Sequence, residues 1–155
     1  MKLIRHTTAG ALYYLNPTEL RLLETVLKKF PFTESAPGQI SRTSADPQTA
    51  ERRRLLHEAL AEHRRELTRS ARTLLTPEKL KPLNQGHLLT LTLPDREVLL
   101  QILNDVRVGC WHSLGQPDTL EPVTSAITDQ ELAWYHLMHV AGHFEENLVR
   151  TSPEN

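Results

Sequence analysis

The chain has 155 residues, of which 39% are hydrophobic and 24% charged, a balance typical of one soluble globular domain with a sizeable core. Its net charge of −1 excludes a strong overall attraction to nucleic acid or to anionic membranes. The single cysteine, Cys110, excludes an internal disulfide, and no apolar run reaches the length of a membrane span, so we expect a cytoplasmic protein.

The first part of the sequence predicts a β-hairpin followed by a helix. Lys2–His6 and Ala11–Leu15 are two runs of strand-forming residues joined by a short segment that ends in Gly10. The segment Asn16-Pro17-Thr18-Glu19 has the order of an N-cap, a first-turn proline and a capping acid. We therefore expect a helix from Pro17 to about Lys29.

The next part predicts a mobile loop and then a long, highly charged helix. Residues 31–45 have few apolar side chains and no period, which is typical of a loop. The helix begins at Asp46-Pro47 and can extend to about Leu75, with sparse leucines among alternating arginines and glutamates. We interpret it as a solvated amphipathic helix, the alternative being a surface for an acidic partner. Nucleic acid is disfavoured, because glutamates interrupt the arginines and no aromatic residues lie between them.

Residues 87–93 alternate apolar and polar side chains and predict a strand near 88–92. We expect this strand to pair with the N-terminal hairpin, because two strands alone are marginally stable. Residues 93–115 then predict the central helix, which Pro94 begins and Gly115 ends. Spacings of three and four place six of its residues on one apolar face: Leu99, Ile102, Leu103, Val106, Cys110 and Leu114.

Arg107 lies at the edge of this apolar face, with Asn104 on the same flank and Asp105 on the opposite one. An arginine that is half-buried beside a core needs a partner, because an unpaired buried charge is very costly. We therefore expect a structural polar clamp between helices and nominate Glu145 as the partner of Arg107. The binding or structural polar cluster that we predict consists of Asn104, Asp105, Arg107 and Glu145. A contact with a ligand or with another protein stays open as the alternative.

The segment Thr128-Asp129-Gln130-Glu131 is a capping box and predicts a final helix to about Arg150. On its polar side a histidine stripe has spacings of three, four and three: His136, His139, His143 and Glu146. Such side chains can chelate zinc or another divalent ion, with a further ligand from His87, His112 or a second subunit. The pattern is not that of a zinc protease, because Val140 follows His139. Exposed or interface-lining histidines are the alternative that we favour.

The segment Leu103-Asn104-Asp105-Val106-Arg107, followed by Leu114-Gly115, resembles the Leu-Asn-Asp-x-Arg…Leu-Gly signature of an uncharacterised bacterial family, one of the domains of unknown function. The end of the chain, Phe144–Val149, is similar to that family's closing Leu-Gln-Glu-x-Leu-Val. The resemblance implies a small, mainly helical cytoplasmic protein, often encoded beside the protease adaptor ClpS. The histidine stripe is not part of that pattern, and the resemblance implies no mechanism.

These patterns predict one domain over residues 1–155, mainly α, with four helices and a small antiparallel sheet. No catalytic set converges in the sequence, so we expect a non-catalytic protein-interaction or regulatory module rather than an enzyme. Its partner would be another protein or a second copy of the chain, and the resemblance links it to regulated proteolysis. The alternative is a metal-binding protein or metallo-hydrolase that uses the histidine stripe.

Overall fold

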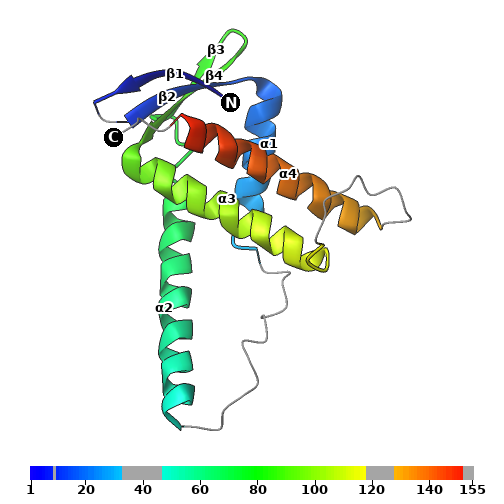
Figure 1. Ribbon diagram of the computed structural model, residues 1–155. Helices are drawn as coiled ribbons and strands as arrows, with labels where there is room; N and C mark the ends of the chain where they lie inside the picture. Colours follow the sequence, from blue (N-terminus) through cyan, green and yellow to red (C-terminus); the bar gives the residue numbers. More distant parts are fainter. Residues whose placement is uncertain (9, 33–46, 118–127, 152–155) are drawn as a thin grey trace.

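The computed structural model describes residues 1–8, 10–32, 47–117 and 128–151. Over these ranges the fold is mainly α with a small antiparallel sheet, which confirms the predicted class. Figure 1 shows the sheet at one end, α3 and α4 side by side next to it, and α2 extending away from them. The strands are β1 (Lys2–Thr7), β2 (Gly10–Leu15), β3 (Leu80–Leu83) and β4 (Gly86–Thr92), and the helices are α1 (Pro17–Lys29), α2 (Pro47–Ala71), α3 (Leu93–Ser113) and α4 (Asp129–Arg150).

The sheet has the strand order β1-β2-β4-β3. Strand β4 pairs with β2 along its length, which confirms the predicted pairing with the hairpin. Gly10 begins β2 so close to β4 that a Cβ atom there would lie 2.1 Å from the carbonyl oxygen of Leu91. The sequence did not predict β3, which has no apolar alternation and contains Pro82. Its position at the edge of the sheet tolerates the proline, and its pairing with β4 makes it a strand.

Local capping fixes where three of the helices begin. Each begins with a capping box, in which the side chain of the first residue accepts from the backbone N–H of the second, and the side chain of the second accepts from the backbone N–H of the first. The pairs are Asn16 with Glu19 in α1, Thr92 with Asp95 in α3, and Thr128 with Glu131 in α4. The observed bounds of α1 and α4 agree with the prediction, because these signals lie within a few residues of the helix start.

The core centres on α3. Of the six predicted apolar residues, Leu114 is partly buried. The other five are at most 1% exposed: Leu99, Ile102, Leu103, Val106 and Cys110. They meet fully buried residues of the sheet such as Tyr13 and Leu89 and of α4 such as Phe144. Arg96, which is only 6% exposed, donates from Nη2 to the carbonyl oxygen of Leu148 at 2.8 Å. This bond ties the start of α3 to the end of α4.

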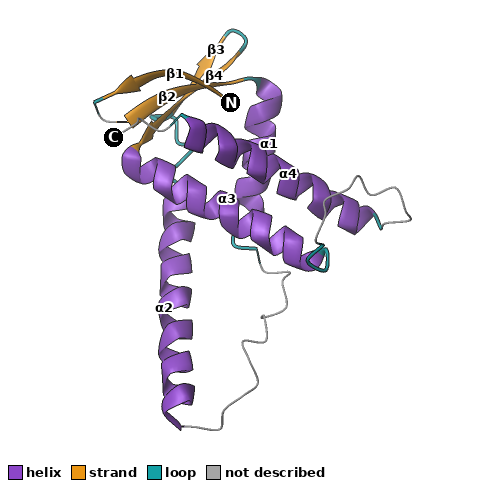
Figure 2. Ribbon diagram, in the orientation of Figure 1, coloured by secondary structure: helices purple, strands orange, loops and turns teal. Residues whose placement is uncertain are grey.

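Among the described residues, the second half of helix α2 makes the contacts with α3. Leu67 is buried, whereas Leu55, Leu56 and Leu60 are 53%, 49% and 48% exposed. The helix therefore extends from the body as an amphipathic rod (Figure 2). Within the described ranges, no helix combines the length and apolar character that crossing a membrane requires.

Phe32 lies in the segment predicted as a mobile loop, yet its side chain is only 5% exposed. Its backbone N–H donates to Oδ2 of Asp105 at 3.0 Å, and its ring lies against α3 at Gly109. Residues 33–45 of the predicted loop lie outside the described residues.

Asp95 joins the first turn of α3 to the turn before β3. Its carboxylate accepts hydrogen bonds from Nζ of Lys79 at 2.6 Å and from Oγ1 of Thr92 at 2.7 Å. Burial raises the pKa of Asp95, but the hydrogen bonds from Lys79 and Thr92 together outweigh it, so the pKa is lowered. A lowered pKa in the folded state means that ionised Asp95 stabilises the fold above its ordinary pKa, and that this contribution is lost as the pH falls through the folded value.

We predict that Asp95→Asn lowers the free energy of unfolding at neutral pH by about 1–3 kcal/mol, because the amide cannot replace the charge-assisted bonds. Urea denaturation should show that the variant loses less stability than the wild type between about pH 5 and pH 2. Glu97→Gln removes an exposed acid two residues away and is the control. Equal losses in the two variants would contradict the prediction.

Candidate functional site

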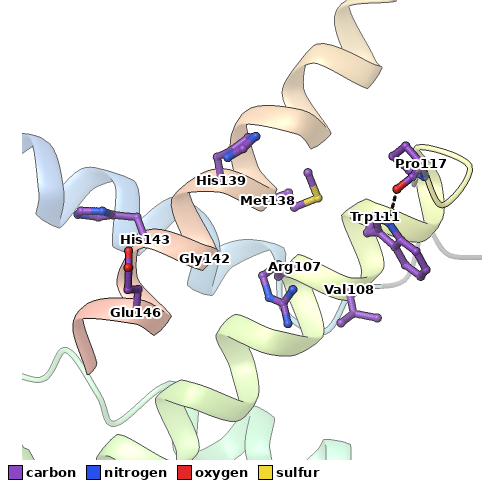
Figure 3. Close-up of a pocket in the computed structure, with 9 residues that line it drawn as sticks. All are labelled: Arg107, Val108, Trp111, Pro117, Met138, His139, Gly142, His143 and Glu146. Atoms are coloured by element: carbon purple, nitrogen blue, oxygen red, sulfur yellow. Dashed lines mark hydrogen bonds between the residues drawn. The ribbon is translucent and has the colours of Figure 1, made fainter. Parts of the chain in front are cut away.

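An open groove with a volume of about 840 Å³ lies between helices α3 and α4 (Figure 3). We call it the α3/α4 groove. Its lining comes from the second half of α3, from Pro117 just after that helix, and from the middle of α4: Arg107, Val108, Trp111, Pro117, Met138, His139, Gly142, His143 and Glu146.

The apolar part of the lining consists of Val108, Trp111, Pro117 and Met138. The indole Nε1 of Trp111 donates to the carbonyl oxygen of Pro117 at 3.2 Å, which orients the ring, and Met138 is 4% exposed. A concave apolar surface with a few polar groups at its edge is the usual composition of a binding site. The α3/α4 groove combines this apolar part with four polar side chains, those of Arg107, His139, His143 and Glu146.

Arg107 forms the predicted clamp between α3 and α4. Its Nε donates to Oε2 of Glu145 at 2.8 Å, and its Nη2 donates to Oδ1 of Asn104 at 2.8 Å. The nomination of Glu145 is therefore confirmed. Because the guanidinium is held at both ends, it fixes one edge of the α3/α4 groove.

Asp105 does not join this cluster. Its carboxylate faces the other flank of α3, where it accepts from the backbone N–H of Phe32 and lies 3.5 Å from Nη2 of Arg64. A second, smaller groove of about 410 Å³ lies on that flank, between α2 and α3, and includes His63, whose Nε2 is 3.0 Å from Oε1 of Gln101. We call it the α2/α3 groove. The four residues predicted as one polar cluster thus divide between the two sides of α3.

Three members of the histidine stripe, His139, His143 and Glu146, line the α3/α4 groove, and His136 does not. In Figure 3 the rings of His139 and His143 point in different directions. The ring of His139 lies edge-on to that of Tyr135, with centroids 4.4 Å apart. The predicted ligands therefore share a groove without converging on one point.

The ligand side chains also have other partners. His143 Nε2 lies 3.1 Å from Nδ2 of Asn147, and Oε1 of Glu146 lies 2.6 Å from Nη2 of Arg150. Among the residues that the structure describes, no three histidine, cysteine, aspartate or glutamate side chains are grouped closely enough to hold a metal ion. Zinc binding would require His143 and Glu146 to leave these partners, and the metal site stays a prediction.

The two further ligands that the sequence offered lie elsewhere. His112 lines the α2/α3 groove, where its Nδ1 is 2.6 Å from Nε2 of Gln116. His87 belongs to β4. His143 also lies near Glu19 of α1. Burial raises the pKa of Glu19, but hydrogen bonds from the Met1 amine and from the backbone of Asn16 lower it. The charges of the Met1 amine and of His143 lower this pKa further.

Helix α2 presents mixed charge rather than a continuous basic surface. Nη2 of Arg54 lies 2.7 Å from Oε1 of Glu51, and Nη1 of Arg65 lies 2.9 Å from Oε2 of Glu62. These pairs offset much of the positive charge that a phosphate backbone would need.

Five lining residues were not predicted from the sequence as site residues: Trp111, Met138, Val108, Pro117 and Gly142. The first two have the apolar spacing of core residues, so nothing in the pattern marks them as lining a groove. Gly142 carries the one available signal, because a glycine inside a long helix costs stability unless the space beside it is used.

Comparisons with known protein families, curated proteins and solved structures gave no match for this chain. The geometry of the groove therefore has to carry the functional inference.

We predict opposite effects for alanine at the two helical glycines of α3 and α4. A Cβ atom at Gly109 would lie 2.4 Å from Cδ1 of Phe32, whereas one at Gly142 would lie 3.6 Å from Cδ of Arg107. Gly109→Ala should lower the free energy of unfolding by about 1–3 kcal/mol through overpacking. Gly142→Ala should raise it by up to about 1 kcal/mol through helix propensity. Urea denaturation of both variants measures this, and equal effects would show that the two sites do not differ.

We also predict that Arg107 and Glu145 are energetically coupled. A double-mutant cycle with Arg107→Gln and Glu145→Gln should give a coupling of about 1 kcal/mol, because the pair is half-buried and joins two helices. The pair Glu146 and Arg150, exposed on α4 alone, is the control and should give less than about 0.5 kcal/mol. A coupling no larger than the control would argue against the clamp.

Proposed function

We propose that this chain is a non-catalytic, regulatory interaction module that holds an apolar segment of a partner protein in the α3/α4 groove. The observation that carries the proposal is an apolar lining, centred on Trp111 and Met138, in a groove whose charged groups already have partners. Its volume falls within the usual range of binding pockets, about 300–1,000 Å³.

The shape and chemistry of the groove support a peptide segment as the occupant. An open groove between two helices suits an amphipathic helix that inserts its apolar face. The imidazole of His139 lies at the edge of the groove and can exchange a hydrogen bond with a polar residue beside the apolar anchor. The partner segment that we propose is therefore apolar on one side and polar at its margin.

The state of the ionisable groups supports binding rather than catalysis. Glu145 is bonded to Arg107, Glu146 to Arg150, and His143 to Asn147. A general acid or base has to be within reach of a substrate proton, and these side chains are committed to structural contacts instead.

The resemblance to the Leu-Asn-Asp-x-Arg family extends the proposal to regulated proteolysis. In this chain the signature residues have architectural positions. Leu103 is buried, Asn104 and Arg107 form the clamp, and Asp105 holds Phe32. The signature would then preserve the frame of the groove, and partner choice would rest with its lining.

Metal binding is the second candidate, and it is favoured by one observation, the shared position of His139, His143 and Glu146 on the α3/α4 groove. The test is a zinc titration of protein purified without an affinity tag, followed by thermal denaturation. A rise in Tm that His139→Ala and His143→Ala abolish would support a site there. An unchanged Tm would remove this candidate.

We predict that filling the groove at Gly142 abolishes partner binding without unfolding the chain. Space lies beside Gly142, so Gly142→Leu projects an apolar side chain into the groove. Ala133→Leu is the matched control, because Ala133 is exposed and nine residues away, which is about 180° around the helix.

The probe is a peptide selected against the full chain from a displayed library and titrated by the fluorescence of Trp111 in a Trp134→Phe background. Gly142→Leu should weaken binding at least about tenfold, and Ala133→Leu should change it less than about twofold. The proposal fails if no peptide is selected, or if the peptides bind Gly142→Leu as well as they bind the wild type.

A further inference from the structure

The four strands of the sheet contain no acidic residue, although the whole chain has 19. They carry three lysine or arginine side chains, Lys2 and Arg5 in β1 and Lys81 in β3. All three are exposed, and none has an ion-pair partner within the part of the chain that the structure describes. The sheet is therefore a local positive surface on a chain whose net charge is −1.

One row of side chains crosses all four strands on the same face of the sheet. Lys2 is paired with Tyr14, Tyr14 with Leu88, and Leu88 with Lys81. Residues directly opposite each other in antiparallel strands point to the same face. The row therefore has a cation at each end, on the two edge strands, and apolar side chains between them.

A second row lies beside the first on the same face. Arg5 is paired with Leu12, and Leu12 is paired with Thr90. We call the surface formed by the two rows the outer sheet face, and it consists of Lys2, Arg5, Leu12, Tyr14, Lys81, Leu88 and Thr90.

The helices cover the opposite face of the sheet. Tyr13 and Leu89 alternate with residues of the outer sheet face along β2 and β4, and both are fully buried. Figure 1 shows α1, α3 and α4 on one side of the sheet. On the outer sheet face Leu12 and Leu88 are partly exposed and Thr90 is exposed, so no described element covers it.

The ring of Tyr14 has a fixed position on the outer sheet face. Its hydroxyl donates to the carbonyl oxygen of Gln85. A Cβ atom at Gly86 would lie 2.8 Å from Cε2 of Tyr14, so the ring lies over the glycine backbone. Tyr14 is partly exposed, and a held, accessible aromatic ring is what nucleic-acid bases stack on without regard to their identity.

We propose that the outer sheet face binds single-stranded nucleic acid, with a base stacked on Tyr14 and phosphates next to the cations of the two edge strands. Neighbouring strands lie about 4.8 Å apart, so the backbones at Lys2 and Lys81 are about 14 Å apart across the sheet. A strand of nucleic acid that crosses the sheet would meet a cation at each side and the ring between them. In a duplex the bases are already stacked, so a single strand fits better.

The acids that border the sheet do not cancel this charge. Asp95, just after β4, is bonded to Nζ of Lys79 at 2.6 Å, and Glu19 is bonded to the Met1 amine. Glu78, two residues before β3, is exposed, but positive charge still exceeds negative charge around the sheet. The outer sheet face differs in this respect from α2, whose arginines are interrupted by glutamates.

An anionic membrane fits the outer sheet face less well. Insertion into a lipid surface needs apolar side chains that protrude, and Leu12 and Leu88, at the centre of the face, are half-buried. An acidic protein would be attracted by the same cations but would not need the fixed ring. Both are therefore outcomes that the experiment has to separate from the proposed one.

The experiment measures the binding of the full chain to fluorescein-labelled oligodeoxythymidine and oligouridine of about ten nucleotides, by fluorescence anisotropy at low salt. Binding of either strand supports the proposal, and the tighter of the two identifies the preferred sugar. Three phosphate contacts predict that log K falls with log salt with a slope of about −2. A duplex of the same length should bind at least about tenfold more weakly.

Removing two of the cations tests where the strand binds. Arg5→Gln with Lys81→Gln should weaken binding at least about tenfold at low salt and reduce the slope to about −0.7. Arg52→Gln with Arg72→Gln, at two exposed arginines in and just after α2, removes the same charge and should change the Kd less than about twofold. Circular dichroism checks that each variant is folded.

The ring of Tyr14 gives a second test. Tyr14→Leu should weaken binding at least about fivefold through the loss of stacking, whereas Tyr14→Phe keeps the ring and should stay within about twofold of the wild type. No binding at low salt, equal losses in the two double variants, or an unchanged Kd in Tyr14→Leu would each overturn the proposal. Equal or tighter binding of polyglutamate or of phosphatidylserine vesicles would also overturn it. None of these residues lines the α3/α4 groove, so the result is independent of the proposed function.

Discussion

The burial of one face of α3 is the constraint on which the rest of the structure depends. Leu99, Ile102 and Val106 are enclosed by the sheet and α4, so the flanks of the helix have to satisfy their own polar groups. One flank does so through Arg107 and the other through Asp105. The buried seam is therefore also what determines where the polar contacts of α3 can lie.

The two grooves follow from those flanks. On one side the clamp holds α3 and α4 together while Gly142 leaves room beside Arg107. On the other side Asp105 holds Phe32, and Gly109 lets the ring approach the helix backbone. A side chain at either glycine would change the distance between neighbouring elements. Small residues thus matter here as much as large ones, because they set how closely the elements approach α3.

Local sequence signals predicted the helix starts, since a capping box and a first-turn proline act within one turn. Wheel geometry also predicted the partner of Arg107, because a half-buried charge has few satisfactory solutions. Strand β3 and the buried Phe32 could not be predicted in this way, since both depend on partners distant in sequence. The histidine stripe shows that local spacing alone does not predict where side chains point. Shared helical phase places the side chains on one side, but rotamers and neighbours such as Asn147 turn them apart.

Helix α3 separates the α3/α4 groove from the α2/α3 groove. The α3/α4 groove draws its lining from α4 and one flank of α3, whereas α2 contributes Leu60, His63 and Leu67 to the α2/α3 groove. A core helix with buried contacts on several sides is hard to deform, so it can present one surface without disturbing the other.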